Sequence, residues 1–295
     1  MKTAYSTAKS ILITGASTGI GWATSMELAN KGWRVFAAVR KEADAQKLRD
    51  ASSNKITPVI MDVIDYESVR KAAREIEIML DGAGLDALFN NAGISVQGPL
   101  EIIPIELFEQ QIRVNVFGHL FVTQTFLPLL RKAQGNIVFT SSESGRVTLP
   151  LMGPYSASKF ALEAVANALR IELRPWKIRV SLVELQTIKT PMWEKIDTST
   201  EKLIASLPQQ AKDLYLKELR TLSVFPKWQA EMGISMEKAV RVIIRALSVK
   251  NPKPRYIVGY EARLLIYNFA VWPTWMMDWL ASKLLILFGY LKPKK

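Results

Sequence analysis

The beginning of the chain constrains its fold more than any other stretch. An apolar run of strand type, Ser10–Thr14, leads into the turn Gly15-x-x-x-Gly19-x-Gly21, and a helical pattern follows as far as Asn30. Glycines between a strand and the N-terminus of a helix let the main chain approach a pyrophosphate group, which the free N–H groups and the dipole of the helix stabilise. Many such turns need glycine for steric reasons alone. At the opening of the first strand–helix unit, however, the turn favours a dinucleotide-binding α/β fold.

The same alternation of strand and helix continues along the chain. Further strand-type runs end at about Val39, Met61, Phe89, Ser142, Val183 and Gly259, with helical patterns between them. Strands that alternate with helices imply parallel pairing through right-handed crossovers. The sequence therefore predicts a Rossmann-type α/β fold, a doubly wound parallel sheet of about seven strands with helices on both faces.

Composition excludes several kinds of site. The 295 residues contain no cysteine and a single histidine, which rules out disulfides, zinc–thiolate sites, cysteine nucleophiles and multi-histidine metal sites. His119 lies in an apolar stretch and is expected to be a packed helix residue. The net charge of +12 favours anionic partners. Because the basic residues are scattered and no nucleic-acid-binding motif is present, nucleic acid is not expected as a partner.

Tyr155 and Lys159 form the strongest candidate for chemistry. Residues four apart on a helix share a face, with their β-carbons about 5–6 Å apart. A phenol titrates near about pH 10, and a neighbouring ammonium favours its ionised form, so the pair suits general acid–base catalysis. Ser142, at the end of a buried strand, is well placed to hold the same substrate oxygen. Tyr-x-x-x-Lys alone also fits an ordinary solvated helix face.

The residues after the second strand bear on the choice of cofactor. A site selective for NAD usually carries an acidic residue there to bind the ribose 2′-hydroxyl. Here Val39 and Arg40 stand in its place. Arginine binds a 2′-phosphate through charge-assisted hydrogen bonds, and Ser17 in the glycine turn can donate another. Although a solvated basic residue remains the alternative, the missing acid predicts NADP(H) in preference to NAD(H).

Taken together, these motifs resemble those of the short-chain dehydrogenase/reductase family. The resemblance runs from Thr14 to about Thr190, and its motifs occur in the family's order: Thr14-Gly-x-x-x-Gly-x-Gly21, Asp62, Asn90-Asn-Ala-Gly93, Asn115, Ser142 and Tyr155-x-x-x-Lys159. It implies that Tyr155 is the catalytic acid/base, that Ser142 orients the substrate oxygen, and that Lys159 binds the nicotinamide ribose and lowers the pKa of the tyrosine.

The resemblance also assigns the remaining site residues. Asn115 would hold a water that relays protons to Lys159, Asp62 would meet the adenine amine, and Asn90 the adenine ribose region. The expected catalytic residues are Asn115, Ser142, Tyr155 and Lys159. The expected cofactor-binding residues are Gly15, Ser17, Thr18, Gly19, Ile20, Gly21, Arg40, Asp62, Val63, Asn90, Ala92, Gly93, Tyr155, Lys159, Ile188 and Thr190.

One motif departs from the family pattern. After the sixth strand the family usually reads Pro-Gly-x-x-x-Thr, whereas this chain reads Leu185-Gln-Thr-Ile-Lys-Thr190. Ile188 and Thr190 remain where the nicotinamide amide and the pyrophosphate are normally met. Loss of the proline and glycine is expected to change the backbone beneath the nicotinamide ring.

The last part of the chain is rich in apolar residues. Residues 1–260 are expected to form one catalytic domain, with a substrate lid at about 191–233, and residues 261–295 a hydrophobic helical extension. The apolar lid indicates either a hydrophobic substrate or packing onto the body. A membrane-spanning helix needs about 20 apolar residues, which Pro273 and two charges interrupt. We therefore expect the extension to form an interfacial helix on a membrane surface. The alternative is a helix that closes the substrate pocket or packs in a dimer.

The resemblance implies an NADP(H)-dependent oxidoreductase that interconverts a hydrophobic ketone or aldehyde and its alcohol. The apolar lid and tail point to a hydroxysteroid or retinol dehydrogenase-like, lipid-metabolising member. The alternatives are a 3-oxoacyl or fatty-acyl reductase and a non-catalytic NADP(H)-binding sensor or scaffold. The N-terminus has no hydrophobic signal core, which predicts a cytoplasmic protein, with peripheral membrane association left open.

The family's helices that hold the asparagine and the tyrosine often pair with their copies in a symmetric partner. Those helices here carry Phe108, Ile112, Phe121, Leu162, Val165, Leu169 and Leu173. Some of these must face the sheet, but together they are more apolar than a solvated face needs. A homodimer or homotetramer is therefore expected.

Overall fold

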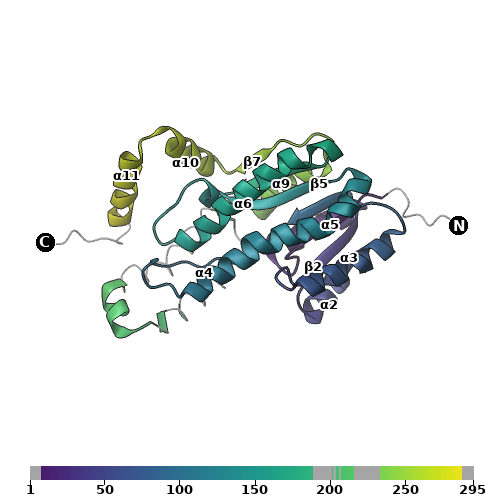
Figure 1. The fold of residues 1–295 in the computed structure, drawn as a ribbon, viewed down its shortest axis with the longest axis horizontal. Coiled ribbons are helices and arrows are strands. Elements are labelled where there is room, and N and C mark those ends of the chain that lie inside the picture. Colours follow the sequence, from purple (N-terminus) through teal and green to yellow (C-terminus); the bar gives the residue numbers. More distant parts are fainter. Residues whose placement is uncertain (1–7, 189–200, 202–203, 206, 216–232, 288–295) are drawn as a thin grey trace.

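Seven parallel strands form one sheet through the centre of the protein (Figure 1). The computed structural model describes residues 8–188, 201, 204–205, 207–215 and 233–287. The strands are β1 (Ser10–Ile13), β2 (Arg34–Val39), β3 (Ile56–Ile60), β4 (Ala87–Asn90), β5 (Asn136–Ser142), β6 (Arg179–Leu185) and β7 (Arg255–Val258). Their order is β3-β2-β1-β4-β5-β6-β7, and every neighbouring pair is parallel. The predicted doubly wound fold is confirmed.

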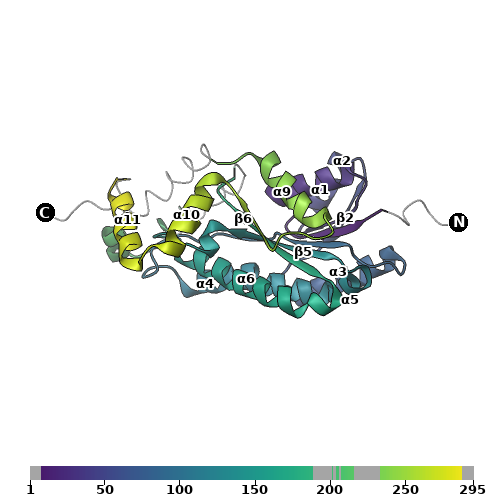
Figure 2. The ribbon, with the colours of Figure 1, turned by 90° about the horizontal axis from the view of Figure 1, so that it is seen from above.

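Helices cover both faces of the sheet, with α1, α2 and α9 on one face and α3, α5 and α6 on the other (Figure 2). The α-helices are α1 (Gly19–Asn30), α2 (Glu42–Ala51), α3 (Tyr66–Leu80), α4 (Ile105–Ile112), α5 (His119–Ala133), α6 (Gly153–Glu172), α9 (Met236–Ser248), α10 (Tyr260–Val271) and α11 (Thr274–Leu287). Three short segments are also helical: the π-helix η1 (Arg113–Gly118) and the 3-10 helices η2 (Glu143–Gly145) and η3 (Arg174–Trp176).

Alternate side chains of the central strands supply two separate cores. Leu12 of β1 packs in the core beneath α3, α5 and α6, whereas its neighbours Ile11 and Ile13 pack beneath α1, α2 and α9. A strand buried on both faces must be apolar at every position. This is why these central strands can be recognised in the sequence as continuous apolar runs.

Helix α3 shows how local sequence sets the boundaries of an element. The side chain of Asp65 accepts hydrogen bonds from the N–H groups of Glu67 and Ser68, which caps the first turn. The helix ends where Asp81 takes a left-handed conformation with φ of 48°. Its apolar residues recur every three or four positions and are buried against the sheet: Val69, Ala72, Ile76 and Leu80.

The direction of winding changes between β1 and β4. Strands β2 and β3 lie on one side of β1, and β4 to β7 lie on the other. In doubly wound sheets, ligands bind outside the carboxyl ends of the strands at this switch point. The glycine turn follows β1 and the Asn90–Gly93 turn follows β4, so both lie there.

The helical region between β4 and β5 is long but is not uniform. Helix α4 passes through the π-helix η1 into α5, which ends at Ala133. A π-helical turn is wider than an α-helical turn and is often found at functional sites. Asn115 lies in this widened turn.

The apolar residues expected on the outer faces of these helices divide between core and surface. Leu162, Leu169 and Leu173 belong to the core beneath α6, so they are not available to a partner. Phe108 and Ile112 are partly exposed and line a groove of about 500 Å³ on the outside of α4 and η1. None of the predicted catalytic or cofactor residues lines this groove.

The C-terminal extension is helical, as predicted, but forms two helices rather than one. Helix α10 ends before Trp272, and α11 begins at Thr274, because Pro273 cannot continue a helix. Both helices lie at the end of the protein far from α2 (Figures 1 and 2). Within the part of the chain that the structure describes, no helix has the length and apolar character needed to cross a membrane.

Much of the predicted lid, at 191–233, lies outside the described residues, as does Thr190. The described part includes residues 204–205 and 207–215. Leu207 packs with Ile204 against the body, where the neighbouring apolar residues are Ile102, Leu107 and Leu151. Packing onto the body, one of the two expected explanations of the lid's apolar residues, is therefore observed for this part.

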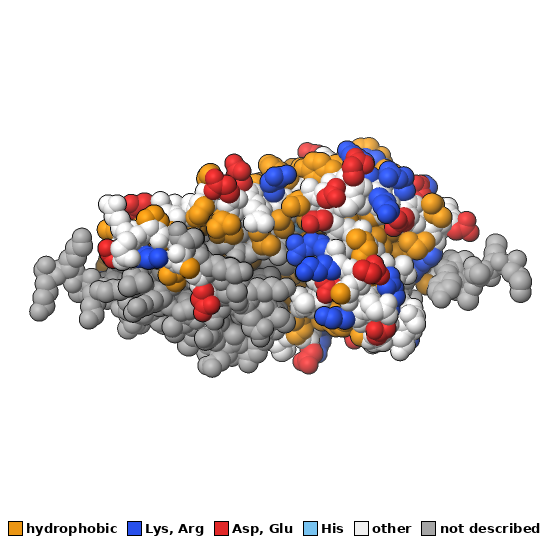
Figure 3. Space-filling view, turned by 90° about the horizontal axis from the view of Figure 1, so that it is seen from below, with side chains coloured by type: hydrophobic (Ala, Val, Ile, Leu, Met, Phe, Trp, Pro, Cys, Tyr) orange, Lys and Arg blue, Asp and Glu red, His pale blue; other side chains and the backbone are white. Residues whose placement is uncertain are grey.

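Charged side chains of both signs are interspersed on the face of the protein that Figure 3 shows. In Figure 3, Lys and Arg side chains lie among Asp and Glu side chains and between apolar patches. Several ion pairs of this kind are local, such as Lys31 with Glu27 at 3.0 Å. Exposed pairs contribute little to stability, about 0–1 kcal/mol each.

Candidate active site

Three of the predicted catalytic side chains meet at the carboxyl end of β5. Ser142 is the last residue of β5, and Tyr155 lies in the first turn of α6. The Tyr155 phenol forms a side-chain hydrogen bond with Ser142. Lys159 lies one turn further along α6, with its Nζ 5.7 Å from the centre of the tyrosine ring. The i, i+4 spacing and the position of the serine at a strand end therefore bring these residues together.

The ionisation of Tyr155 differs from the expectation based on sequence. Burial raises the pKa of Tyr155 to about 12, while its hydrogen bond with Ser142 acts in the opposite direction. The Lys159 Nζ donates a hydrogen bond to the main-chain oxygen of Thr140, at 2.8 Å. Burial also lowers the pKa of Lys159 to about 8. The protein groups alone do not lower the pKa of the phenol, because burial disfavours the charged form of both side chains.

Asn115 is buried and holds the segment that follows the Asn90–Gly93 turn. Its Nδ2 donates to the oxygen of Ile94 at 3.0 Å and to Oγ of Ser158 at 3.1 Å, and its Oδ1 accepts from the N–H of Ile94 at 3.0 Å. Both amide hydrogens are therefore used within the protein. A water-holding role for Asn115 would have to use its main chain instead.

Gln111 and Ser158 belong to the same network, although the sequence analysis did not name them. Gln111 Nε2 donates to the oxygen of Ile94 at 2.7 Å, and its Oε1 accepts from the N–H of Val96 at 2.6 Å. The Ser158 hydroxyl donates to the main-chain oxygen of Tyr155 at 2.7 Å. Ser158 stands inside the Tyr155–Lys159 motif, which was its only signal in the sequence.

The glycine turn is locked against the turn that follows β4. Gly15 has φ of +65°, and a β-carbon there would lie 2.7 Å from the Cα of Ala92. Thr14 Oγ1 accepts hydrogen bonds from the N–H groups of Asn91 and Ala92, at 2.9 and 3.0 Å. Asn91 Nδ2 in turn donates to the oxygen of Thr14 at 3.1 Å. Two loops from neighbouring strands thus form one rigid floor at the switch point.

The N-terminus of α1 has the features of an anion site. Its N-cap residue, Thr18, makes no side-chain capping bond, and the first turn carries no acidic residue. The N–H groups of that turn are therefore open to an anion, which the helix dipole would stabilise. Ser17, Thr18 and Ile20 are partly or fully exposed around this end. These residues fit the pyrophosphate of a dinucleotide.

The residues predicted for the adenosine end follow β2, β3 and β4. Arg40 is exposed directly after β2, as a 2′-phosphate ligand must be. Asp62 and Val63 follow β3, and the Asp62 carboxylate accepts from the N–H of Ile64 at 3.2 Å. Asn90 is fully buried, and its Nδ2 donates to Oγ1 of Thr123 at 2.9 Å. Any contact of Asn90 with a cofactor is therefore through its main chain.

His119 contacts the turn that follows β4, which packs against the glycine turn. It is fully buried, as predicted, and one ring nitrogen is hydrogen-bonded to the main-chain oxygen of Ala92. Burial lowers the pKa of His119 to about 3, with the positive charge of Lys159 acting in the same direction. The ring is therefore neutral at physiological pH. Among the described residues, no group of three metal-ligating side chains is found.

A model of the family described as short chain dehydrogenase matches residues 9–201. The chain belongs to the short-chain dehydrogenase family. It is 34% identical to the NADPH-dependent 3-dehydrocapnine reductase of Ornithobacterium rhinotracheale, over 90% of this chain and 94% of that protein. It is 31% identical to the 17-beta-hydroxysteroid dehydrogenase type 6 of Bos taurus, over 93% of this chain and 88% of that protein. The expected membership of the short-chain dehydrogenase family is thereby confirmed. The expectation that the protein is an oxidoreductase is confirmed with it.

A solved short-chain dehydrogenase has the same fold. The crystal structure of a Burkholderia cenocepacia member in complex with NADP superposes with a TM-score of 0.71 and 25% identity, over 97% of this chain and 98% of that one. The agreement extends over the whole sheet and beyond the residues that the family model matches.

Gln186, where this chain departs from the short-chain dehydrogenase motif, is accommodated by a glycine in a distant segment. Gln186, in the place of the usual glycine, is nearly buried, and its N–H donates to the oxygen of Val258 at 3.0 Å. Its side chain lies over Gly259, where a β-carbon would be 2.0 Å from Oε1 of Gln186. Gly259 has φ of +120° and immediately precedes α10. Space for the glutamine thus comes from a glycine more than 70 residues away.

Proposed function

We propose that this short-chain dehydrogenase interconverts a hydrophobic ketone or aldehyde and its alcohol with NADP(H). The observation that carries the proposal is the meeting of Ser142, Tyr155 and Lys159 beside the glycine turn, at the switch point of the sheet. Two of the similar proteins support the choice of cofactor, since one is named as NADPH-dependent and the other was solved with NADP.

The roles follow from the chemistry of the side chains. The protonated phenol of Tyr155 would donate its proton to the carbonyl oxygen, and the Ser142 hydroxyl would hold that oxygen. The Lys159 ammonium would bind the nicotinamide ribose. NADPH would supply the hydride to the carbonyl carbon. Asn115 would act through its main chain and through the loop that it holds.

The remaining cofactor contacts are proposed from their positions. The main chain of Gly15, Gly19 and Gly21 would line the pyrophosphate, with Ile188 near the nicotinamide. Ser17 and Arg40 would bind the 2′-phosphate. Thr190 would extend the pyrophosphate site but lies outside the described residues.

A hydrophobic substrate is proposed from the apolar lid and from the hydroxysteroid dehydrogenase among the relatives. The domain division expected from the sequence, with a catalytic domain at 1–260, a lid at about 191–233 and an extension at 261–295, is part of the same proposal. A cytoplasmic location also remains a prediction.

Self-association is proposed through the apolar groove on α4 and η1. Its lining residues are Ile105, Phe108, Glu109, Ile112, Arg113 and Phe117. Phe117 and Ile105 are exposed at 51% and 61%, which is costly for large apolar side chains in water. We expect a homodimer or homotetramer by light scattering at micromolar concentration, and a monomer there would contradict the proposal.

The test of function is a screen of ketones and alcohols that follows the absorbance of the reduced cofactor. On any active substrate, Tyr155→Phe should lower kcat by roughly 10²–10⁴-fold, because it removes only the proton donor, and should leave NADPH affinity near that of the wild type. Tyr66→Phe is the matched control, since this tyrosine is exposed on α3 and stacks on Phe121. It should keep full activity.

The screen also separates the alternatives. Turnover of 3-oxoacyl substrates alone would favour the acyl reductase. A wild type that binds NADPH tightly but turns over none of the substrates would favour the non-catalytic sensor. Full activity of Tyr155→Phe would overturn the proposed mechanism.

A further inference from the structure

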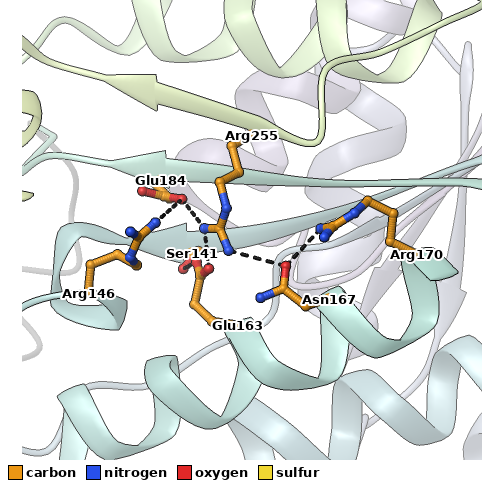
Figure 4. A network of polar contacts seen from close by, with 7 residues as sticks. All are labelled: Ser141, Arg146, Glu163, Asn167, Arg170, Glu184 and Arg255. Atoms are coloured by element: carbon orange, nitrogen blue, oxygen red, sulfur yellow. Dashed lines mark hydrogen bonds and ion pairs between the residues drawn. The ribbon is translucent and has the colours of Figure 1, made fainter. Parts of the chain in front are cut away.

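A network of charged and polar side chains joins α6 to the strands β5, β6 and β7 (Figure 4). Its members come from four strands and helices and from the turn after β5: Ser141, Arg146, Glu163, Asn167, Arg170, Glu184 and Arg255. None of them belongs to the motifs by which the family is recognised above. Buried charges cost several kcal/mol unless they are paired and hydrogen-bonded, so a network of this kind needs an explanation.

Glu163 connects this network to α6, the helix that carries Tyr155 and Lys159. Its carboxylate accepts a hydrogen bond from Oγ of Ser141 at 2.6 Å and forms an ion pair with Arg255. Ser141 immediately precedes Ser142 on β5, and Glu163 lies one turn after Lys159 on α6. One carboxylate therefore ties the strand that carries Ser142 to the helix that carries Tyr155 and Lys159.

The turn after β5 packs directly on this contact. A β-carbon at Gly145 would lie 3.0 Å from Cγ of Glu163 and 3.1 Å from Oγ of Ser141. Helix η2 therefore lies against α6 with no room for a side chain. The relative positions of β5, η2 and α6 thus depend on the Ser141–Glu163 pair.

Arg255 does not neutralise Glu163 by itself, because it is shared. The same guanidinium also pairs with the fully buried Glu184, which lies beside Ser141 on the neighbouring strand β6. Arg146 is 3.9 Å from Glu184 and more exposed. Burial and the nearby Glu163 raise the pKa of Glu184. Glu184 thus has Arg146 as a second cation, and the negative charge beside α6 is that of the Glu163 carboxylate.

The ammonium of Lys159 lies in the field of this charge. Its Nζ is hydrogen-bonded to the uncharged carbonyl of Thr140, and burial lowers its pKa to about 8 while Glu163 opposes that effect. The other titratable groups that face it are Tyr155 on α6 and His119 on α5, which are neutral near pH 7. Glu143 on η2 acts on Tyr155.

We propose that Glu163 is a positioning residue for the proposed reaction. Clamped by Ser141 and Arg255, its carboxylate holds α6 against β5 and supplies the negative charge that keeps the Lys159 ammonium charged. The effect on catalysis rests on the proposed function, but the effect on Lys159 does not. The two can therefore be tested separately.

The direct test follows Lys159 by NMR in protein labelled with 13Cε-lysine, with its signal assigned by its absence from Lys159→Arg. Glu163→Gln keeps the shape and an acceptor for Ser141 but removes the charge. It should lower the titration midpoint of Lys159 by roughly one pH unit. Glu163→Asp keeps the charge and should leave the midpoint near that of the wild type. Glu172→Gln, the same substitution at an exposed position of α6, should also leave it there.

An unchanged midpoint in Glu163→Gln, or an equal shift in Glu172→Gln, would overturn the proposal. If Glu163→Gln does not fold, Arg255→Gln provides a test of opposite sign. Removal of the guanidinium leaves the negative charge of Glu163 less balanced, so the midpoint of Lys159 should rise, and a fall or no change would overturn the proposal.

A second readout is the pH profile of NADPH binding and of kcat/KM. Both should decline with rising pH as Lys159 loses its proton, and in Glu163→Gln the decline should begin about one pH unit lower. A wild type that neither binds NADPH nor turns over a substrate would refute the proposed function. The shifted NMR midpoint would still support the role of Glu163.

Discussion

At the residue scale, burial sets the proton-transfer properties of the site. The phenol of Tyr155 has a pKa raised to about 12 and stays protonated near neutral pH. A protonated phenol is a proton donor, which suits carbonyl reduction. Lys159 and a positively charged nicotinamide ring would both favour the phenolate that alcohol oxidation requires. The direction of reaction is therefore expected to depend on the redox state of the cofactor.

Arg40 is predicted to decide the choice between NADPH and NADH. Arg40→Ala should weaken NADPH binding by roughly ten- to a hundredfold, since a charge-assisted hydrogen bond contributes ~1.5–3 kcal/mol. NADH has no 2′-phosphate, and its affinity should change little. Calorimetric titration with both cofactors measures the two effects. Arg74→Ala, at an exposed position of α3, is the control. Equal losses for both cofactors, or a wild type that prefers NADH, would contradict the assignment.

His119 is predicted to make the protein sensitive to acid. Its pKa is about 3 in the folded protein and 6.5 as a free side chain, so the unfolded state binds the proton more tightly. The contribution of the neutral His119 to the free energy of unfolding is fully present above about pH 6.5, and it is lost as the pH falls toward 3. The loss between pH 6.5 and about pH 5 should be ~2 kcal/mol.

Urea unfolding at about pH 7 and pH 5 measures this effect. His119→Gln retains a donor for the oxygen of Ala92 but does not titrate, so its free energy of unfolding should fall less between the two pH values. An identical pH dependence in the variant and the wild type would show that other groups are responsible.

At the scale of the elements, Gly259 joins the end of β7 to α10 and leaves room for Gln186. Gly259→Ala should lower the free energy of unfolding by ~2–4 kcal/mol. Backbone strain contributes ~1–2 kcal/mol, and the contact with Gln186, which a β-carbon would approach to 2.0 Å, contributes the rest.

Gly32→Ala is a matched control for this substitution. Gly32 has φ of +80° and no atom within 4 Å of its added β-carbon, so only the backbone strain applies. The double variant Gln186→Gly, Gly259→Ala should recover the steric part but not the strain. Equal losses in Gly259→Ala and Gly32→Ala would show that Gln186 can move aside at no cost.

At the scale of the whole molecule, the C-terminal extension is the most unusual feature. Trp272, Trp275 and Trp279 are exposed by 41%, 71% and 57%, and Lys283 lies 5.8 Å from the ring of Trp279. Tryptophan beside lysine is typical of a membrane interface. We propose that α10 and α11 contact an anionic membrane surface. Lys292, Lys294 and Lys295, which we would expect to meet anionic lipid, lie outside the described residues.

Full-length protein should therefore sediment with anionic liposomes, and truncation after Glu261 should release it. Trp275→Ala should weaken binding by roughly tenfold if it removes ~60 Å² of buried apolar surface at about 25 cal/mol per Å². Trp176→Ala removes an exposed tryptophan that packs on Arg131, far from the extension in sequence, and should have no effect. High salt should weaken binding only in part. Full-length protein that ignores liposomes, together with a truncation that raises KM, would show instead that the extension closes the pocket.

The sequence by itself determined the parts of this protein that depend on local periodicity. The central strands β1, β2 and β4 are buried on both faces and are therefore almost continuous apolar runs. Tyr155 and Lys159 share a helix face at any packing, because i and i+4 are neighbours on every α-helix. Ser142 and the glycine turn lie at the carboxyl edge because parallel strands all end there.

Only the tertiary structure decided what depends on contacts between distant segments. Asn90 and Asn91 are adjacent, yet Asn90 faces α5 while Asn91 faces the glycine turn. Glu163 and Arg255 are 92 residues apart, and their pairing has no local signal. The pKa of Tyr155 likewise follows from the surfaces packed around the ring. The physical reason is common to all three, since burial and long-range pairing arise only when the layers of the fold come together.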